Sequence, residues 1–129
     1  MPRRAEQVSG EGGPDVILDV IFEDGLFFLA VANIGAQPAV DVRVKFTHPL
    51  TGLEGTREIS ALPLFRSLAF LAPHKTIRAY LDTSASFFAR RCPTLIEAEI
   101  SFRDRAGNQF ACAIRHDLRI YKDLGYVRR

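Results

Sequence analysis

The sequence LFFLAVANIGAQPAVDVRVKF, residues 26–46, decides the fold. Its second half carries an apolar residue at every second position from Val40 to Phe46, with charged residues between them. A period of two residues predicts a β-strand with one buried face and one wet face. Asn33 and Gly35 tolerate left-handed backbone, and Pro38 fixes φ before the second strand. The stretch therefore predicts two strands joined by a turn.

The residues before this stretch predict a hairpin with its first strand. Residues 15–23, DVILDVIFE, alternate apolar and polar side chains. The dipeptide Asp-Gly at 24–25 favours a type I′ turn, which needs positive φ at both central positions. That turn pairs Glu23 with Leu26 and sets Phe22 opposite Phe27, so that the core-facing pairs are apolar.

The opposite face of this hairpin carries apolar residues as well. Ile17, Ile21 and Phe28 fall on it, and the same register puts Ile21 directly across from Phe28. An outward apolar patch is either covered by the N-terminal tail of the same chain or offered to another chain. These three residues are therefore the candidate interface.

The C-terminal part predicts a second hairpin. Residues 95–102 and 109–118 alternate, and the loop at 105–107 places Gly in the left-handed bulge position. The resulting register sets Glu97 opposite Arg115 on the wet face. An opposite-charge cross-strand pair supports a register that was chosen for other reasons.

The middle of the chain is less regular. Residues 56–60 predict a short edge strand, and residues 63–71 a strand with a kink or bulge. Residues 75–82 alternate again as a strand. A helical turn is expected near 84–90, with a hydroxyl as N-cap and Arg near its C-terminal end.

The fold class predicted from these elements is all-β, an immunoglobulin-like antiparallel β-sandwich of about seven strands. Residues 1–14 are polar and Gly-rich, which predicts a disordered N-terminal tail. Residues 15–129 form a single sandwich domain in this interpretation. Such a length is enough for one core and short for two.

Composition argues against several partners. The chain of 129 residues is 47% hydrophobic and 25% charged, with a net charge of +2. This charge is too small to indicate nucleic acid or an anionic membrane as a partner. Neither a signal peptide nor an apolar run of about 18 residues is present, so we expect a cytoplasmic protein if the chain is complete.

Several short motifs resemble the bacterial immunoglobulin-like domains known as CARDB, or cell-adhesion-related domains. N-I-G-A-Q-P-A-V-D-V-R-V at 33–44 resembles the signature in which a strand ends at Asn-x-Gly and the next alternates Val with polar residues. Residues 71–73 resemble the family's turn before a strand, although His74 follows where Gly is usual. Residues 102–108 resemble its hairpin. The resemblance implies a sandwich used as an adhesive, spacer or accessory module, with no catalytic residues to transfer.

Signals for catalysis or metal binding are missing from the sequence. It contains no nucleophile elbow, no Walker-type loop and no G-x-G-x-x-G motif. His48, His74 and His116 have no partners at zinc or calcium spacing. Cys92 and Cys112 do not face each other in the second hairpin, so free thiols are expected. We therefore expect no catalytic residues, no metal and no cofactor, and a protein that is not an enzyme.

Two functions remain. The first is a binding or structural module that mediates protein–protein interaction or self-association, through a sheet edge or through the candidate interface. The alternative is a site for a small ligand or carbohydrate, built from loops at one end of the sandwich. Its candidate residues are Phe87, Phe88 and Arg105.

Overall fold

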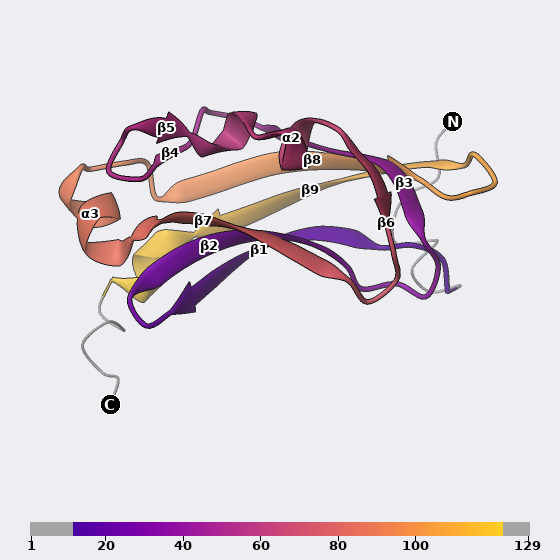
Figure 1. Ribbon diagram of the computed structural model, residues 1–129, viewed down its shortest axis with the longest axis horizontal. Coiled ribbons are helices and arrows are strands. Elements are labelled where there is room, and N and C mark those ends of the chain that lie inside the picture. The colour runs from indigo at the N-terminus through magenta and orange to yellow at the C-terminus, as the bar shows by residue number, and fades with distance from the viewer. Residues whose placement is uncertain (1–11, 123–129) are drawn as a thin grey trace.

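A computed structural model describes residues 12–122 and shows an all-β sandwich of two antiparallel sheets (Figure 1). The smaller sheet has three strands in the order β1-β2-β7. These strands are β1 (Val16–Glu23), β2 (Leu26–Asn33) and β7 (Thr76–Thr83). The larger sheet has the order β6-β3-β8-β9. Its strands are β3 (Ala39–Phe46), β6 (Leu68–Leu71), β8 (Leu95–Arg103) and β9 (Gln109–Asp117).

Short elements close the ends of the sandwich. A two-stranded hairpin lies above the larger sheet in Figure 1, and the helix α3 lies at one end. The elements outside the two large sheets are β4 (Thr51–Gly52), β5 (Arg57–Glu58), α2 (Pro63–Arg66), α3 (Ser84–Ala89) and 3₁₀ turns at Ile59–Ala61 and Leu118–Tyr121. The helical turn expected near 84–90 is thus confirmed. Thr83 is its N-cap and accepts a hydrogen bond from the backbone N–H of Ser86.

Both predicted hairpins are confirmed in register. Phe22 lies opposite Phe27 and Ile21 opposite Phe28 in the first hairpin. Asp24 and Gly25 both have positive φ, as the type I′ turn requires. The second hairpin sets Glu97 opposite Arg115, and the two side chains form an exposed ion pair at 3.9 Å.

The core lies between the two sheets. Alternate residues of the facing strands fill it, and the turns add two phenylalanines from the short helices. The largest fully buried side chains include Phe27, Leu29, Phe65, Phe87, Ile100 and Phe102. Burying a side chain of this size contributes about 1.5–3 kcal/mol to the free energy of unfolding.

The turn at Asn33 joins three parts of the chain. The buried Asn33 side chain accepts hydrogen bonds from the N–H groups of Asp15 and Gly35, and it donates to the carbonyls of Gln37 and Leu71. A Cβ on Gly35 would lie 2.2 Å from the carbonyl oxygen of Gly13. Only glycine permits this close approach, which explains the residue types at the position that organises the fold.

The segment 63–71 differs from its prediction. It is not one kinked strand but the helical turn α2 followed by β6. Pro63 occupies a first-turn position of α2, where its missing N–H costs nothing. The mixed apolar spacing of this segment arises because a helical turn and a strand follow each other with only Ser67 between them.

Val40 also differs from its prediction. It was expected to face the core, but a bulge at Asp41, with φ of 52°, shifts the phase of β3. Ala39 is fully buried, whereas Val40 is half-buried and lies opposite Phe70, which is 52% exposed. The apolar face of the strand therefore begins with Ala39 and resumes at Val42.

The tail was predicted to end at residue 14, but the fold already begins at Gly13. Gly13 accepts a hydrogen bond from the N–H of Ala36, and Pro14 is buried, so both belong to the fold. The rest of the predicted tail, residues 1–11, lies outside the described residues, as do residues 123–129.

Candidate functional site: the free edge of β9

The backbone N–H and C=O groups of the edge strand β9 point alternately toward β8 and away from the sheet. Hydrogen bonds from Asp104 N–H to the Asn108 carbonyl (3.0 Å) and from Leu118 N–H to the Thr94 carbonyl (2.8 Å) bracket the β8–β9 ladder. Hydrogen-bonded and non-hydrogen-bonded pairs alternate in an antiparallel ladder, so even-numbered residues of β9 bond to β8. The N–H and C=O groups of odd-numbered residues therefore point away from the sheet.

These outward groups have no partner among residues 12–122. The four residues concerned are Gln109, Ala111, Ala113 and Arg115, and no hydrogen bond from outside β9 reaches their backbone in the described part of the chain. Their side chains all lie on the solvent face of the sheet. A row of unpaired backbone groups of this kind is a template for another strand.

The edge of β1 lies on the same side of the sandwich but is capped. Leu18 presents its carbonyl to a ring nitrogen of His116 at 2.7 Å, and the Val16 carbonyl accepts from the thiol of Cys112 at 3.9 Å. Val20 donates its N–H to the Asp19 carboxylate at 2.9 Å. Three alternate residues of β1, whose backbone groups point to the edge, thus have side-chain partners, and two of these partners come from β9.

Burial keeps the Cys112 thiol in the form that caps β1. Desolvation raises the pKa of Cys112, and the carboxylates of Asp15 and Glu99 raise it further. The thiol is therefore protonated at neutral pH and donates a weak hydrogen bond.

The remaining edges offer less free backbone. β6 has only four residues, and the β7 edge ends where the Leu81 carbonyl accepts a hydrogen bond from Leu53 N–H at 2.8 Å. The open part of β7 also carries Arg78, whose guanidinium pairs with Glu23 at 3.2 Å. β9 is thus the longest regular edge without a cap in the described chain.

Two hollows lie over β8 on the solvent face of the larger sheet, each with β3 on one side and β9 on the other. One, of about 590 Å³, lies beside Glu97, Glu99, Ala113 and Arg115. The short side chain of Ala113 leaves space beside longer neighbours, so side chains of an added strand would find room there.

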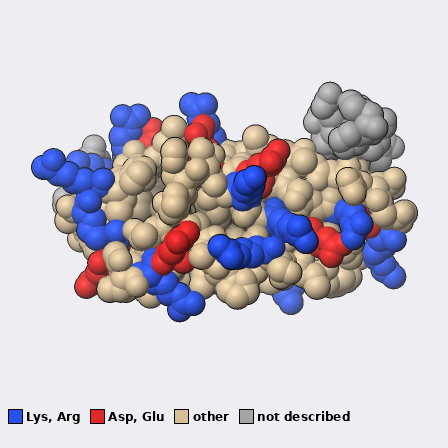
Figure 2. Space-filling view, turned by 90° about the horizontal axis from the view of Figure 1, so that it is seen from above, with Lys and Arg blue, Asp and Glu red and all other residues tan. Residues whose placement is uncertain are grey.

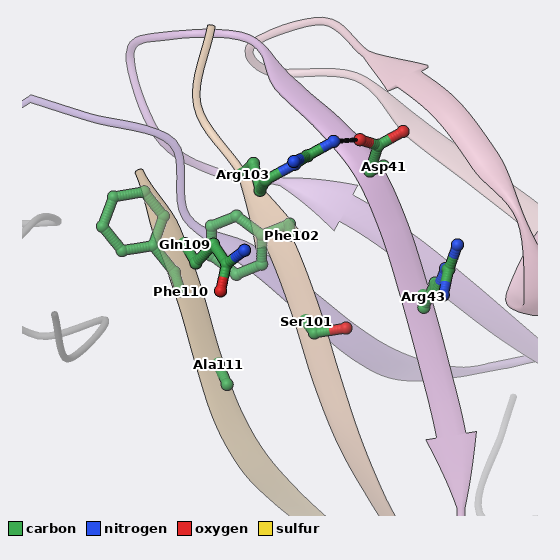
Figure 3. A pocket seen from close by; sticks show the side chains of 8 residues that line it. All are labelled: Asp41, Arg43, Ser101, Phe102, Arg103, Gln109, Phe110 and Ala111. Atoms are coloured by element: carbon green, nitrogen blue, oxygen red, sulfur yellow. Dashed lines mark hydrogen bonds and ion pairs between the residues drawn. The ribbon is translucent and has the colours of Figure 1, made fainter. Parts of the chain in front are cut away.

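The second hollow lies nearer the β8–β9 turn. It has a volume of about 470 Å³ and is lined by Arg43, Ser101 and Gln109 among others, with the ion pair of Arg103 and Asp41 at its rim (Figure 3). Acidic and basic side chains are intermixed on this side of the molecule (Figure 2). Such mixing favours a partner recognised by shape and backbone over one attracted by net charge.

The residues of the candidate interface lie close together, as predicted from the sequence, and are partly covered. Ile17, Ile21 and Phe28 are each half-buried on the outer face of the smaller sheet. The Arg78 guanidinium lies 4.4 Å from the centre of the Phe28 ring, and Tyr80 packs against that ring at 5.7 Å. The neighbouring strand β7 thus partly covers Phe28. The sequence also left open that the N-terminal tail covers this patch, but residues 1–11 of that tail lie outside the described residues.

The candidate loop site is not assembled. Phe87 is fully buried, and both Phe87 and Phe88 pack edge-on against Phe27. Arg105 lies in the β8–β9 turn, at the opposite end of the sandwich from α3 (Figure 1). The three residues therefore cannot contact one ligand.

Sequence reasoning missed a buried ion pair at the α3 end. The Asp82 carboxylate is 1% exposed and accepts from the Arg90 guanidinium at 2.6 Å. Burial by itself raises the pKa of Asp82, but hydrogen bonds from Arg90, Thr83, Ser86 and Glu54 lower it below its ordinary value. An acidic residue one position before an N-cap was the available signal. The pair joins α3 to β7 and the β4–β5 hairpin, which is a structural role.

The family follows from comparison with known proteins. Residues 3–122 match a family described as a domain of unknown function, DUF8453. The chain belongs to this family. No curated protein and no solved structure matches the chain.

The DUF8453 domain, as this chain shows it, brings no metal-binding cluster together in its described part. Among residues 12–122 no group of three or more His, Cys, Asp or Glu side chains is placed to hold a metal ion. Both cysteines are free thiols. No helix in the same range is long and apolar enough to cross a membrane. The open edge of β9 is the feature that offers unsatisfied binding groups.

Proposed function

We propose that this chain is a non-catalytic, immunoglobulin-like binding module that takes a strand of a protein partner onto the edge of β9. The observation that carries the proposal is the contrast between two neighbouring edges. β1 is capped by side chains, whereas β9 leaves the N–H and C=O groups of four alternate residues unpaired within residues 12–122.

Backbone pairing accounts for the affinity in this proposal. Each hydrogen bond formed with a partner strand contributes about 0.5–1.5 kcal/mol net. Side chains at alternate positions of the added strand then enter the hollow beside Ala113 and supply specificity. No titrating group or cofactor takes part.

The immunoglobulin-like character has support in the turn geometry. His74 has φ of 64°, a left-handed conformation, at the position where the resembled pattern has Gly. The Asn33 side chain and the close packing of Gly35 give the Asn-x-Gly sequence a structural reason. These features support a sandwich module of the adhesive or accessory kind.

The test uses a phage-displayed library of random nine-residue peptides selected on the wild-type protein. Ala113→Pro removes an N–H that points to solvent, so the fold tolerates it but an added strand loses a hydrogen bond and meets the ring. Selected peptides should bind this variant at least about tenfold more weakly.

Two variants serve as controls. Ala113→Ser keeps the N–H, and Thr76→Pro places a proline on the exposed start of β7. Both should bind the selected peptides as the wild type does. Equal binding to Ala113→Pro, or a selection that recovers no peptide, would contradict the proposal.

A further inference from the structure

We infer, resting on the proposed function, that the strand added to β9 is the β9 of a second copy of this chain, antiparallel, with Ala113 on the two-fold axis. The two larger sheets then join into one sheet of eight strands. The inference rests on three properties of β9: its register, its half-buried inner face and its charges.

The direction of the backbone limits the register. Residues that point their N–H and C=O groups to the edge must lie opposite residues that do the same, and these are the odd-numbered ones. A two-fold axis at Ala113 pairs this residue with itself and Ala111 with Arg115 of the second copy. A shift of one step toward the β8–β9 turn pairs Ala111 with Ala113 and puts Cys112 opposite its own copy; we call this the shifted register.

The inner face of β9 is incompletely covered. Phe110 is buried, but Cys112, Ile114 and His116 face the core side and are only half-buried. In the inferred register Cys112 lies opposite Ile114 of the second copy, and each covers the other. Apolar surface that the sandwich leaves open at this edge is thereby removed from water.

The outer face favours the same register by charge. Arg115 lies opposite Ala111 of the second copy and is directed toward the uncharged Ser101, the cross-strand neighbour of Ala111. Asp117 lies opposite Gln109 of that copy and is directed toward Arg103, which has the opposite charge. In the shifted register Arg115 lies opposite Gln109 and is directed toward Arg103, the cross-strand neighbour of Gln109. Like charges in that position oppose pairing.

The capped edge of β1 limits the contact to one sheet. Because side chains occupy the outward carbonyls of Val16 and Leu18, the smaller sheets do not join. A single strand pair is small beside the roughly 800 Å² per partner of a stable interface, so the dimer should dissociate in the micromolar range or above.

The first test is the mass in solution, by light scattering at protein concentrations from about 10 μM to about 1 mM, the range in which a weak dimer dissociates. The wild type and Thr76→Pro should shift from monomer to dimer. Ala113→Pro should stay a monomer. A wild type that is monomeric at the highest concentration, or an Ala113→Pro dimer, overturns the inference.

The second test is the register. In a Cys92→Ser background, Ile114→Cys places each new thiol opposite Cys112 of the other copy, in a non-hydrogen-bonded pair with Cα atoms about 4.5 Å apart, within disulfide range. Mild oxidation should give a covalent dimer with two disulfides, seen by intact mass. The background alone should not cross-link, and adding Cys112→Ala to Ile114→Cys should abolish the product. Cross-linking of the background through Cys112 indicates the shifted register and overturns the one inferred.

The two proposals fail separately. If the wild type stays monomeric while peptides from the library bind and lose affinity for Ala113→Pro, the edge takes foreign strands and only the self-pairing is wrong. If the wild type and Ala113→Pro dimerise equally, β9 is not the interface of the dimer and the self-pairing is wrong, whereas the proposed function fails only if the selected peptides also bind Ala113→Pro as they bind the wild type. Circular dichroism confirms that each variant retains the β spectrum of the wild type.

Discussion

The edge strands β1 and β9 lie on the same side of the sandwich, one in each sheet. They differ in whether their outward backbone groups have hydrogen-bond partners. β1 has side-chain partners on Val16, Leu18 and Val20. β9 has none on its outward groups within residues 12–122. Natural sheets commonly protect their edges, because a bare edge pairs with other chains.

Two of the side chains that cap β1 come from β9. His116 and Cys112 reach β1 from the inward face of β9 itself. β9 therefore protects its neighbour and leaves its own edge open. Strand addition is therefore opposed at the β1 edge of the smaller sheet, and the β9 edge of the larger sheet has no such caps.

Ile114→Pro should have the largest effect on stability. Its N–H bonds to β8, so the substitution removes a ladder hydrogen bond, leaves a carbonyl of β8 without a partner and loses side-chain packing. The free energy of unfolding should fall by about 4 kcal/mol or more. Ala113→Pro, one residue away, should cost within about 1 kcal/mol because its N–H is free. Urea unfolding of the two variants measures the difference. Equal losses would mean that β9 does not alternate between a bonded and a free side.

Asn33→Ala should follow, with a loss of about 2–3 kcal/mol. The change removes the partners of four backbone groups, including the N–H of Asp15 just before β1. Thermal unfolding gives the loss, and amide exchange should show β1 opening more often than β9. An unchanged melting temperature would show that water replaces the side chain without cost.

His116→Ala should cost about 1–2 kcal/mol. It leaves the Leu18 carbonyl without its partner at the β1 edge. Arg115→Ala is the matched control on the same strand, since its ion pair is exposed and contributes little. Chemical unfolding of both variants decides the point, and a smaller loss for His116→Ala than for Arg115→Ala would argue against the cap.

The pH dependence of the Cys112 cap should give the smallest effect. Because folding raises the pKa of this thiol, its contribution to stability is complete below the pKa of the unfolded chain, near 9.0. It is lost as the pH rises through the higher pKa of the folded protein. Melting temperatures of the wild type and Cys112→Ala should therefore converge in alkali. A difference that stays constant from pH 7 to about 11 would contradict the raised pKa.

The sequence predicted local pairing well because turn chemistry and alternation act over short distances. Asp24-Gly25 set the first hairpin, and the Gly107 turn set the second. Pairings between distant segments, such as β2 with β7 and β3 with β8, depend on how the sheets assemble. Alternation carries no information on strand order, so these were not predicted.

The candidate functional surface could be predicted from the sequence only in part. A sheet edge was named as a route for binding, but which strand would be free depends on contacts such as His116 with Leu18, which are 98 residues apart. Phe28 looked exposed because Arg78, its cover, comes from a strand whose position was unknown. The bulge at Asp41 had no signal in the pattern.

Amide hydrogen exchange of the wild type, measured residue by residue by NMR at a concentration where it is monomeric, tests the central claim most directly. The account predicts alternation along β9, with slow exchange at Cys112 and Ile114 and fast exchange at Ala111, Ala113 and Arg115. Uniform protection along β9 would contradict it, because the edge would then already be paired within the chain.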